Sequence, residues 1–157
     1  MRASIASLVL FAALLGGCSL LDRDDDAPPY WVSVRATEAN LRVGPSESYR
    51  ILWVYHRPGL PMKVVREHEG WRLVRDAEGA QGWMVSRLLT RDRSAIVVGD
   101  DSVAMRSEPA ATARVKWQLE PGVIGRLGSC EEGWCRMMIG DRGGYVRADA
   151  LWGAGPP

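Results

Sequence analysis

One short stretch occurs twice in the chain, and the rest of the sequence repeats in register with it. Residues 67–74 read EHEGWRLV and residues 130–137 read CEEGWCRM, so each copy places Glu-Gly-Trp at the same point. Residues typical of β-strands lead into both stretches and out of them, and acidic residues followed by Gly favour a tight reversal. We therefore expect each copy to form a β-hairpin.

The repeat extends over most of the chain with only small gaps. Matched positions lie 64, then 63, then 62 residues apart: Leu41 with Met105, Pro58 with Pro121, and Leu89 with Leu151. Two single-residue gaps account for both changes of offset. A repeat of this length, interrupted only by loop-sized gaps, indicates two copies of one domain. The predicted fold class is all-β, with domains at residues 30–90 and 95–152.

The small size of each copy predicts that the two copies do not stand alone. The composition, 46% hydrophobic and 25% charged, is that of a globular chain rather than a disordered one. A domain of about 60 residues buries only about 60% of its unfolded surface. The linker at residues 91–94 is short and charged and leaves little freedom between the copies. We expect them to pack together or to be stapled.

The N-terminal 17 residues have the pattern of a secretory signal. Arg2 supplies a positive start, and the apolar run that follows is shorter than the roughly 20 residues of a membrane-spanning helix. The sequence LGGC at residues 15–18 resembles the bacterial lipobox, in which cleavage before the Cys leaves it to carry lipid. This resemblance implies lipidation of Cys18. The alternatives are a plain signal peptide and an uncleaved anchor.

Residues 18–29 are interpreted as a tether between the lipid and the first domain. They include the run DRDDDAPP, whose charges and prolines keep a chain extended and prevent its burial. Ser19, rather than Asp, follows Cys18. If lipoprotein sorting operates as in the proteins that this segment resembles, the chain is anchored in the outer membrane facing the periplasm, in preference to the inner membrane.

The opening of the first copy resembles a known family. Residues 39–51 read ANLRVGPSESYRI, and Gly70-Trp71 and Gly82-Trp83-Met84 follow downstream. This is similar to the bacterial SH3-like domains, which carry N-x-R-x-G-P, a polar loop and a Tyr before the next strand. The resemblance implies two tandem small SH3-like β-barrels and a cell-wall peptide or glycan as ligand. The residues it nominates for ligand binding are Asn40, Arg42, Tyr49 and Trp71.

The second copy departs from the family pattern at three places in its loop. It carries Ala104, Glu108 and Ala113 where the first copy has Asn40, Gly44 and Tyr49. The first copy is therefore the better candidate for ligand binding, and the second is expected mainly to support it. The tryptophans at the hairpins and at Trp83 fit either a packing role or a ligand contact.

A strand downstream of the loop has an alternating pattern that predicts which side chains point inward. Residues 115–119 read VKWQL, so Trp117 should face the core, and by register so should Trp53. The outward positions of the first copy are then Leu52 and Val54, which are apolar. These two are candidates for a surface covered by the second copy or by a partner. The alternative function is accordingly a periplasmic adaptor that docks a protein partner through domain one.

The cysteines divide into one lipid acceptor and one pair. With Cys18 assigned to lipid, Cys130 and Cys135 remain in an exported chain, where disulfides persist. Their counterparts at an offset of 63 are Glu67 and Arg72, whose opposite charges would face each other across the first hairpin. Closing a six-residue loop is worth about 2 kcal/mol, against about 0.2–1 kcal/mol for an exposed ion pair. We therefore predict a disulfide.

Catalytic and metal-dependent functions find little support in the sequence. A strand through Glu67-His68-Glu69 would send the imidazole to the opposite face from both carboxylates, so no metal site is predicted. No Gly-rich phosphate loop precedes a helix. Cell-wall peptidases carry domains of this family in front of a catalytic domain, whereas this chain ends after its second copy. We expect a non-enzyme without cofactor.

The balance of charge argues against a nucleic-acid partner. The chain has 20 Lys and Arg and 19 Asp and Glu, and loss of Arg2 with the signal segment leaves 19 of each. Such a chain has no broad positive field that would steer nucleic acid towards it. The expected partners are the membrane, through the lipid, and either the cell wall or an envelope protein.

Overall fold

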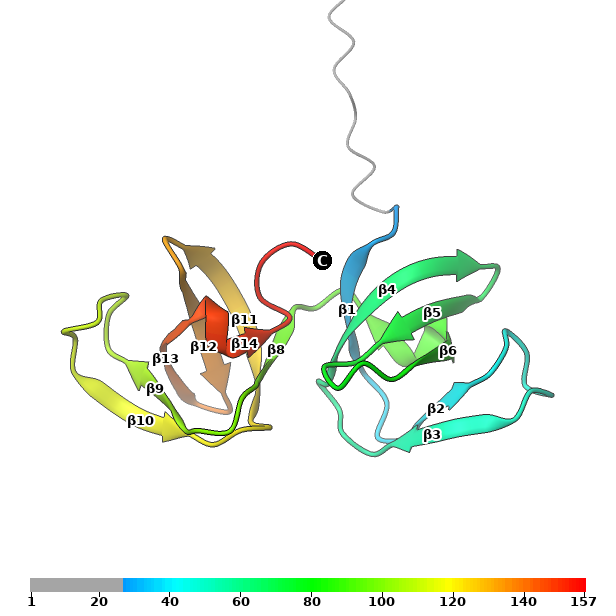
Figure 1. Cartoon of the computed structure of the whole chain (residues 1–157), viewed down its shortest axis with the longest axis horizontal. Helices are drawn as coiled ribbons and strands as arrows, with labels where there is room; N and C mark the ends of the chain where they lie inside the picture. Colours follow the sequence, from blue (N-terminus) through cyan, green and yellow to red (C-terminus); the bar gives the residue numbers. More distant parts are fainter. Residues whose placement is uncertain (1–26) are drawn as a thin grey trace, which may run out of the picture.

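The computed structural model describes residues 27–157, which form two β domains side by side, joined by a short linker (Figure 1). The first sheet contains β1 (Tyr30–Val34), β2 (Ala39–Arg42), β3 (Ile51–Tyr55), β4 (Pro61–His68), β5 (Trp71–Arg75), β6 (Gln81–Val85) and β7 (Leu89–Thr90). The second contains β8 (Ser94–Val97), β9 (Val103–Arg106), β10 (Val115–Leu119), β11 (Ile124–Glu131), β12 (Trp134–Ile139), β13 (Arg142–Arg147) and β14 (Leu151–Trp152). One turn of 3-10 helix precedes the last strand of each domain, η1 (Ser86–Leu88) and η2 (Ala148–Ala150). The described residues contain no α-helix, so the predicted all-β class with two tandem domains is confirmed.

The two sheets have the same strand order, and every strand pair is antiparallel. The order is β3-β2-β6-β5-β4-β1-β7 in the first domain and β10-β9-β13-β12-β11-β8-β14 in the second. The repeated Glu-Gly-Trp stretches form the turns between β4 and β5 and between β11 and β12, as predicted. Glu69 and Glu132 open these turns with φ of 48° and 49°, in the left-handed region that tight hairpin turns use.

The strand pairings reproduce the offsets of the sequence repeat. Arg42 of β2 pairs with Trp83 of β6, and Arg106 of β9 pairs with Tyr145 of β13. Arg42 and Arg106 are 64 residues apart, whereas Trp83 and Tyr145 are 62 residues apart. The two single-residue gaps of the sequence repeat therefore fall in loops between β2 and β6 in the first domain and between β9 and β13 in the second. The predicted duplication is therefore present in the three-dimensional structure as well as in the sequence.

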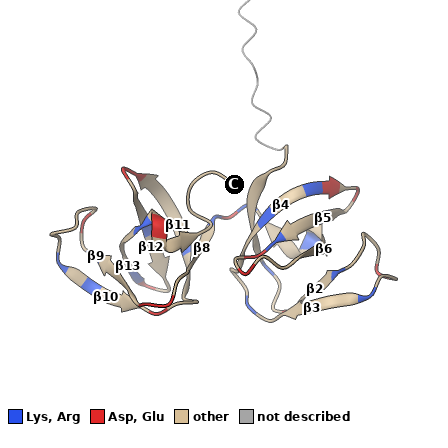
Figure 2. Ribbon diagram, in the orientation of Figure 1, with Lys and Arg blue, Asp and Glu red and all other residues tan. Residues whose placement is uncertain are grey.

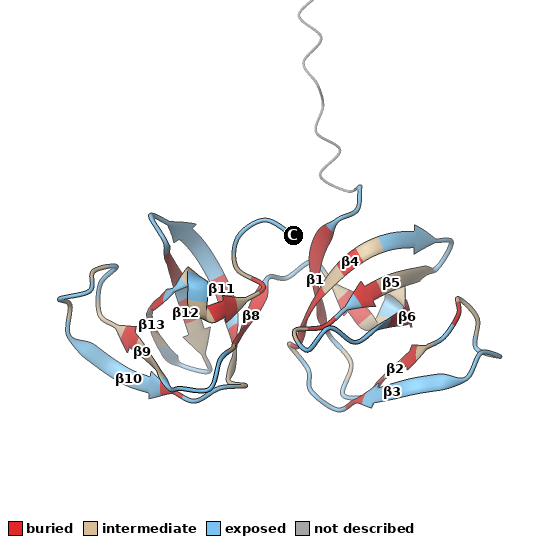
Figure 3. Ribbon diagram, in the orientation of Figure 1, coloured by how far each residue is buried: buried red, intermediate tan, exposed pale blue. Residues whose placement is uncertain are grey.

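β1 and β8 are buried along their whole length because each packs on two sides (Figure 3). Tyr30, Val32 and Val34 of β1 point into the core of the first domain. The alternate residues, Trp31 and Ser33, face the second domain and are also buried. A strand with one face on its own core and the other against a second layer has no exposed face.

Apolar and polar contacts join the two domains across β1 and β8. The ring of Trp31 meets that of Trp152 edge to face at 5.1 Å between centroids. The Trp31 indole Nε1 also donates to the carbonyl of Gly155 at 3.0 Å. Ile96 of β8 belongs to the buried cluster of the first domain rather than to its own. The expectation that the two copies pack together is confirmed.

The prediction that Trp53 and Trp117 point inward is wrong. Trp53 is 60% exposed and Trp117 is 40% exposed. Both lie on the outermost strands, β3 and β10, which pair with one neighbour only and project from the body of each domain (Figure 1). The first four residues of each strand are all exposed and only the last, Tyr55 or Leu119, is buried, so alternation along them does not separate inside from outside. Leu52 and Val54 are exposed for the same reason.

Candidate functional site

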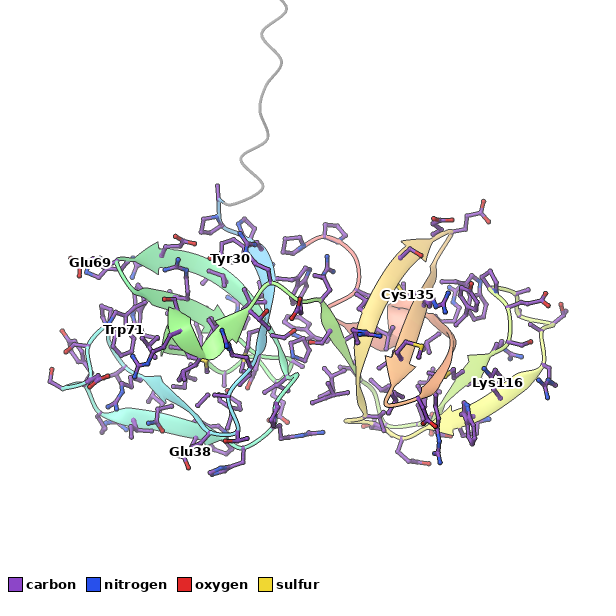
Figure 4. The ribbon with its side chains drawn as sticks, turned by 180° about the vertical axis from the view of Figure 1, so that it is seen from behind. Tyr30, Glu38, Glu69, Trp71, Lys116 and Cys135 are labelled. Carbon is purple, nitrogen blue, oxygen red and sulfur yellow. A yellow bond between two sulfur atoms is a disulfide. The ribbon has the colours of Figure 1, made fainter. Side chains whose placement is uncertain are left out.

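A groove on the outer side of the first domain holds the best candidate site. It lies between the loop that joins β2 to β3 and the end of β4, with a volume of about 410 Å³. Its lining consists of Val43, Gly44, Pro45, Tyr49, Arg66, Glu67, His68 and Trp83. The neighbouring residues Glu69 and Trp71 mark this outer end in Figure 4, away from the contact between the domains.

Tyr49 lies in the wall of the groove, and the ring is positioned by the loop itself. A Cβ atom added to Gly44 would lie 2.7 Å from the Tyr49 ring, so the ring packs directly on the glycine backbone. Arg42 donates from Nη1 to the Tyr49 carbonyl at 2.7 Å. With its ring against Gly44 and its carbonyl held by Arg42, Tyr49 remains 47% exposed. This geometry assigns Arg42 to positioning the loop.

Trp83 forms the floor of the groove, with two cationic or titratable side chains beside it. Its ring is only 6% exposed, and the guanidinium of Arg66 lies over it at 5.1 Å from the centroid. The imidazole of His68 meets the same ring edge to face at 6.2 Å. Arg66 and His68 alternate along β4 and therefore project on one side. The groove thus combines an aromatic base with the Arg66 guanidinium, and the one carboxylate of its lining, that of Glu67, is paired with Arg72.

The structure brings together only part of the set nominated from the sequence. Tyr49 lines the groove and Arg42 supports it, whereas Asn40 and Trp71 are not in its lining. Asn40 pairs with Val54 of β3, and Trp71 pairs with His68 across the hairpin. Sequence reasoning missed the contributions of Arg66 and His68 and left Trp83 undecided between core and ligand contact. The alternation of β4 was the signal that could have found the first two.

The second domain has a groove at the equivalent position with different chemistry. It encloses about 270 Å³ and is lined by Pro109, Ser129, Glu131, Glu132, Trp134 and Tyr145. Through the repeat, Ser129 replaces Arg66, Glu131 replaces His68, and Tyr145 replaces Trp83. The aromatic base is kept, and the rim loses its arginine and gains two carboxylates, Glu131 and Glu132. The two grooves therefore differ in the charge of the group that they favour.

The hairpin that borders each groove is held by a different cross-strand link. Cys130 and Cys135 face each other across β11 and β12 and form a disulfide, with 4.0 Å between their Cα atoms. At the same register in the first domain, Arg72 Nε lies 3.1 Å from Glu67 Oε1. Both pairs are in contact, as the alignment of the two copies predicts.

The Glu67 and Arg72 pair is partly buried because Tyr30 of β1 lies against it. The Tyr30 hydroxyl donates to the Glu67 carboxylate and accepts from Arg72 Nε at 2.9 Å. Burial, followed by the hydrogen bond to Glu67, raises the pKa of the Tyr30 hydroxyl above its ordinary value. The guanidinium of Arg91 covers the Tyr30 ring at 3.5 Å from the centroid. This hairpin is thereby fixed to the first strand of its domain.

The predicted signal segment and lipid site lie outside the described residues. The described residues themselves contain neither a metal-binding cluster nor a membrane-spanning helix. The signal segment and Cys18 lie in residues 1–26, which the structure does not describe. Within residues 27–157, no group of three or more His, Cys, Asp or Glu side chains is placed to hold a metal ion. In the same range, no helix has the length and apolar character needed to span a membrane.

The model of the bacterial SH3 domain matches the chain twice, at residues 35–90 and 99–153. "Putative N-acetylmuramoyl-L-alanine amidase YrvJ" of Bacillus subtilis (strain 168) is 24% identical over 132 residues. That match covers 78% of this chain, which spans about a quarter of the length of this relative, 25%.

Among solved structures, NlpC2 from Trichomonas vaginalis is 14% identical with a TM-score of 0.37, over 79% of this chain and 48% of that one. An NlpC/P60 family protein from Bacillus cereus ATCC 10987 is 13% identical with a TM-score of 0.34, over 78% and 56%. The family match stands on the two sequence segments, each of which contains all the strands of one sheet except the first, β1 or β8. The chain belongs to the bacterial SH3 domain family and contains two copies of that domain.

Proposed function

We propose that this chain is a non-catalytic binding module that attaches to cell-wall peptide or glycan through the groove of its first domain. The observation that carries the proposal is the exposed Tyr49 ring beside the Trp83 floor. Flat aromatic surfaces bind sugar rings and peptide planes by stacking, and Arg66 at the rim suits a carboxylate on the same ligand. Membership of the bacterial SH3 domain family and the amidase name of one relative support a ligand from the cell wall.

The arrangement of the two grooves favours a long ligand over a small one. They lie on the outer sides of the two domains, while β1 and β8 pack together in the centre (Figure 1). One small molecule does not reach both grooves. A polymer that presents many copies of a peptide or sugar can engage both, and two linked contacts bind more tightly than either alone. The acidic second groove would then contact an amino group of such a polymer.

The residues of the first groove support binding more than catalysis. His68 lies edge to face against the Trp83 ring. The two cysteines among residues 27–157 are joined to each other, which leaves neither as a thiolate. We therefore assign the module no reaction of its own.

Substitution of the exposed tyrosine tests the proposal directly. A stacked aromatic contributes on the order of 1 kcal/mol or more, so Tyr49→Ala should weaken co-sedimentation with purified cell wall roughly fivefold or more. Because Tyr49 is about half exposed, the melting temperature should change little. Tyr145→Ala, at the base of the second groove, tests that groove separately and should weaken co-sedimentation less than Tyr49→Ala.

The outcomes of this experiment separate two functions. If Tyr49→Ala sediments like the wild type, the ligand does not bind in the first groove. If the wild type does not sediment with cell wall at all, the adaptor function takes precedence. That function has its own support, because Leu52, Trp53 and Val54 form an exposed apolar edge strand. Charged substitutions such as Leu52→Asp would then abolish recovery of an envelope protein partner.

We further propose that Cys18 carries lipid and anchors the module in the cell envelope, on the outer membrane facing the periplasm. LGGC and the acidic, Pro-containing segment behind it support this. Cys18→Ser should move the protein from the detergent-extracted membrane fraction to the soluble envelope fraction. The change should be nearly complete, because stable anchoring depends on the acyl chains. Unchanged fractionation of the variant would contradict the proposal.

A further inference from the structure

A cavity lined by residues of both domains lies apart from both grooves. Its volume is about 530 Å³, which is within the range of small-molecule sites, and such sites occur preferentially where domains meet. Segments from both domains contribute to it: the end of β1, the loop before β4, the linker, the start of β11, and the turn after β12. The linker in Figure 2 carries both basic and acidic residues at this junction.

Three arginines from separate segments line this cavity. They are Arg35 after β1, Arg93 in the linker and Arg126 in β11. Within residues 27–157, none of the three forms an ion pair. The one carboxylate in the lining, that of Asp92, accepts a hydrogen bond from the Thr90 hydroxyl at 3.1 Å. The cavity therefore has an excess of positive charge from groups that can form paired hydrogen bonds.

Arg93 is the most constrained of the three. Its Nη2 donates to the carbonyl of Gly153 at 2.6 Å, which fixes the guanidinium at the domain junction. Burial lowers the pKa of Arg93 below its ordinary value. All three arginines are exposed residues, and a cation without an opposing carboxylate is stabilised when an anion binds beside it.

The remaining walls are largely apolar. Val34, Pro58, Ile124, Met138 and Ile139 line the cavity together with the arginines. Near Pro58, Arg57 Nη2 donates to the carbonyl of Gly122 at 2.6 Å and ties the two domains together. A ligand that fits these surroundings has an oxyanion at one end and a short hydrocarbon body.

We propose that the cavity between the domains binds an organic anion, with a carboxylate or phosphate head held by Arg35, Arg93 and Arg126. The apolar body lies against Ile124 and its neighbours. Guanidinium groups match the geometry of both oxyanions, so the two heads share one recognition chemistry. This site is independent of the grooves and of the cell-wall function proposed for them.

The test uses the Cys18→Ser chain, which keeps every residue of the cavity, and two-dimensional amide NMR at constant ionic strength. The probes are hexanoate, hexyl phosphate and, as the uncharged control, hexan-1-ol. Hexanoate, hexyl phosphate or both should shift the amides of Gly59, Ile124 and Gly140, whereas hexan-1-ol should leave them in place. Whichever head binds more tightly identifies the source as an organic acid or a phosphate ester.

Two matched variants complete the experiment. Arg126→Gln should weaken binding about tenfold, because it removes a charge-assisted contact. Arg114→Gln, an exposed arginine in the loop between β9 and β10, should leave the affinity unchanged. The proposal is overturned if no amide of the cavity shifts at about 20 mM probe, where even a millimolar Kd gives near saturation. It is equally overturned if hexan-1-ol shifts the same amides as strongly, or if the two variants lose affinity alike.

Discussion

Gly82→Ala should destabilise the first domain by about 1–3 kcal/mol, the cost typical of adding a methyl group to a filled site. A Cβ atom at Gly82 would lie 2.8 Å from the backbone carbonyl oxygen of Arg42 and 2.7 Å from Cγ of Leu41. The oxygen belongs to the neighbouring strand, so relief requires the backbone of β2 to move. For a domain of about 60 residues, the melting temperature should fall by roughly 5–20 °C.

The duplication supplies a second test of the same contact. Gly144 is the counterpart of Gly82, and a Cβ atom there would lie 2.6 Å from the carbonyl oxygen of Arg106. Gly144→Ala should therefore destabilise the second domain in the same way. Gly70→Ala is the control, since a Cβ at Gly70 would meet no atom within 4 Å. Thermal unfolding followed by circular dichroism would count against this account if Gly82→Ala melted together with Gly70→Ala.

The features that depend on the repeat itself are predictable from the sequence. An alignment of two copies compares each position with its structural equivalent, so a contact in one copy implies a contact in the other. For this reason the sequence alone places Glu67 opposite Arg72 and Cys130 opposite Cys135, and both pairs lie in that register. The all-β class follows from the same source, because turn residues recur at matched positions in both copies.

The sequence could not predict which strands are covered, because coverage is a property of the whole assembly. Alternation along residues 115–119 is real, yet the first four residues of β10 are all exposed and only Leu119 is buried. The reverse applies at Tyr30–Val34, where every residue is buried because the second domain covers the face that β1 turns away from its own core. An unbroken buried strand implies a second layer, although sequence alone does not say which part of the chain supplies it.

The sequence also does not show when two differences between the copies compensate each other in the core. The positions of Met62 and Val74 in the first domain are occupied in the second by Gly125 and Met137. A Cβ atom at Gly125 would lie 2.7 Å from Cε of Met137, so the larger residue fills the space that the smaller one leaves. Core volume is conserved over the pair rather than at each position. A comparison of the two copies one position at a time therefore counts two differences, although together they are one compensated change in core packing.

The candidate site shows the same effect at Gly44 and Tyr49. The glycine is required because the tyrosine ring packs on its backbone. The second copy has lost both together, with Glu108 and Ala113 in their places. In the sequence, these are separate departures from a family pattern. In the structure they are one change, which removes the exposed ring and alters the loop that bears it.

Trp31→Ala should be the most damaging of the aromatic substitutions, with a loss of about 3–5 kcal/mol in the free energy of unfolding, typical of a buried tryptophan. Trp31 is 8% exposed, meets the Trp152 ring at 5.1 Å and donates to Gly155 at 3.0 Å. All of these contacts bridge the two domains. The variant should therefore separate the unfolding of the two domains as well as lower their stability, which differential scanning calorimetry would detect as two transitions in place of one.

Trp53→Ala is the matched control, because it removes the same side chain from an exposed position on β3. With Trp53 60% exposed, its replacement should change the free energy of unfolding by about 0.5 kcal/mol or less, as is usual at surface positions. Equal losses from Trp31→Ala and Trp53→Ala would contradict both the burial of β1 between the domains and the outward position of β3. A single transition in the Trp31→Ala variant at wild-type temperature would show that the domains do not depend on this contact for their stability.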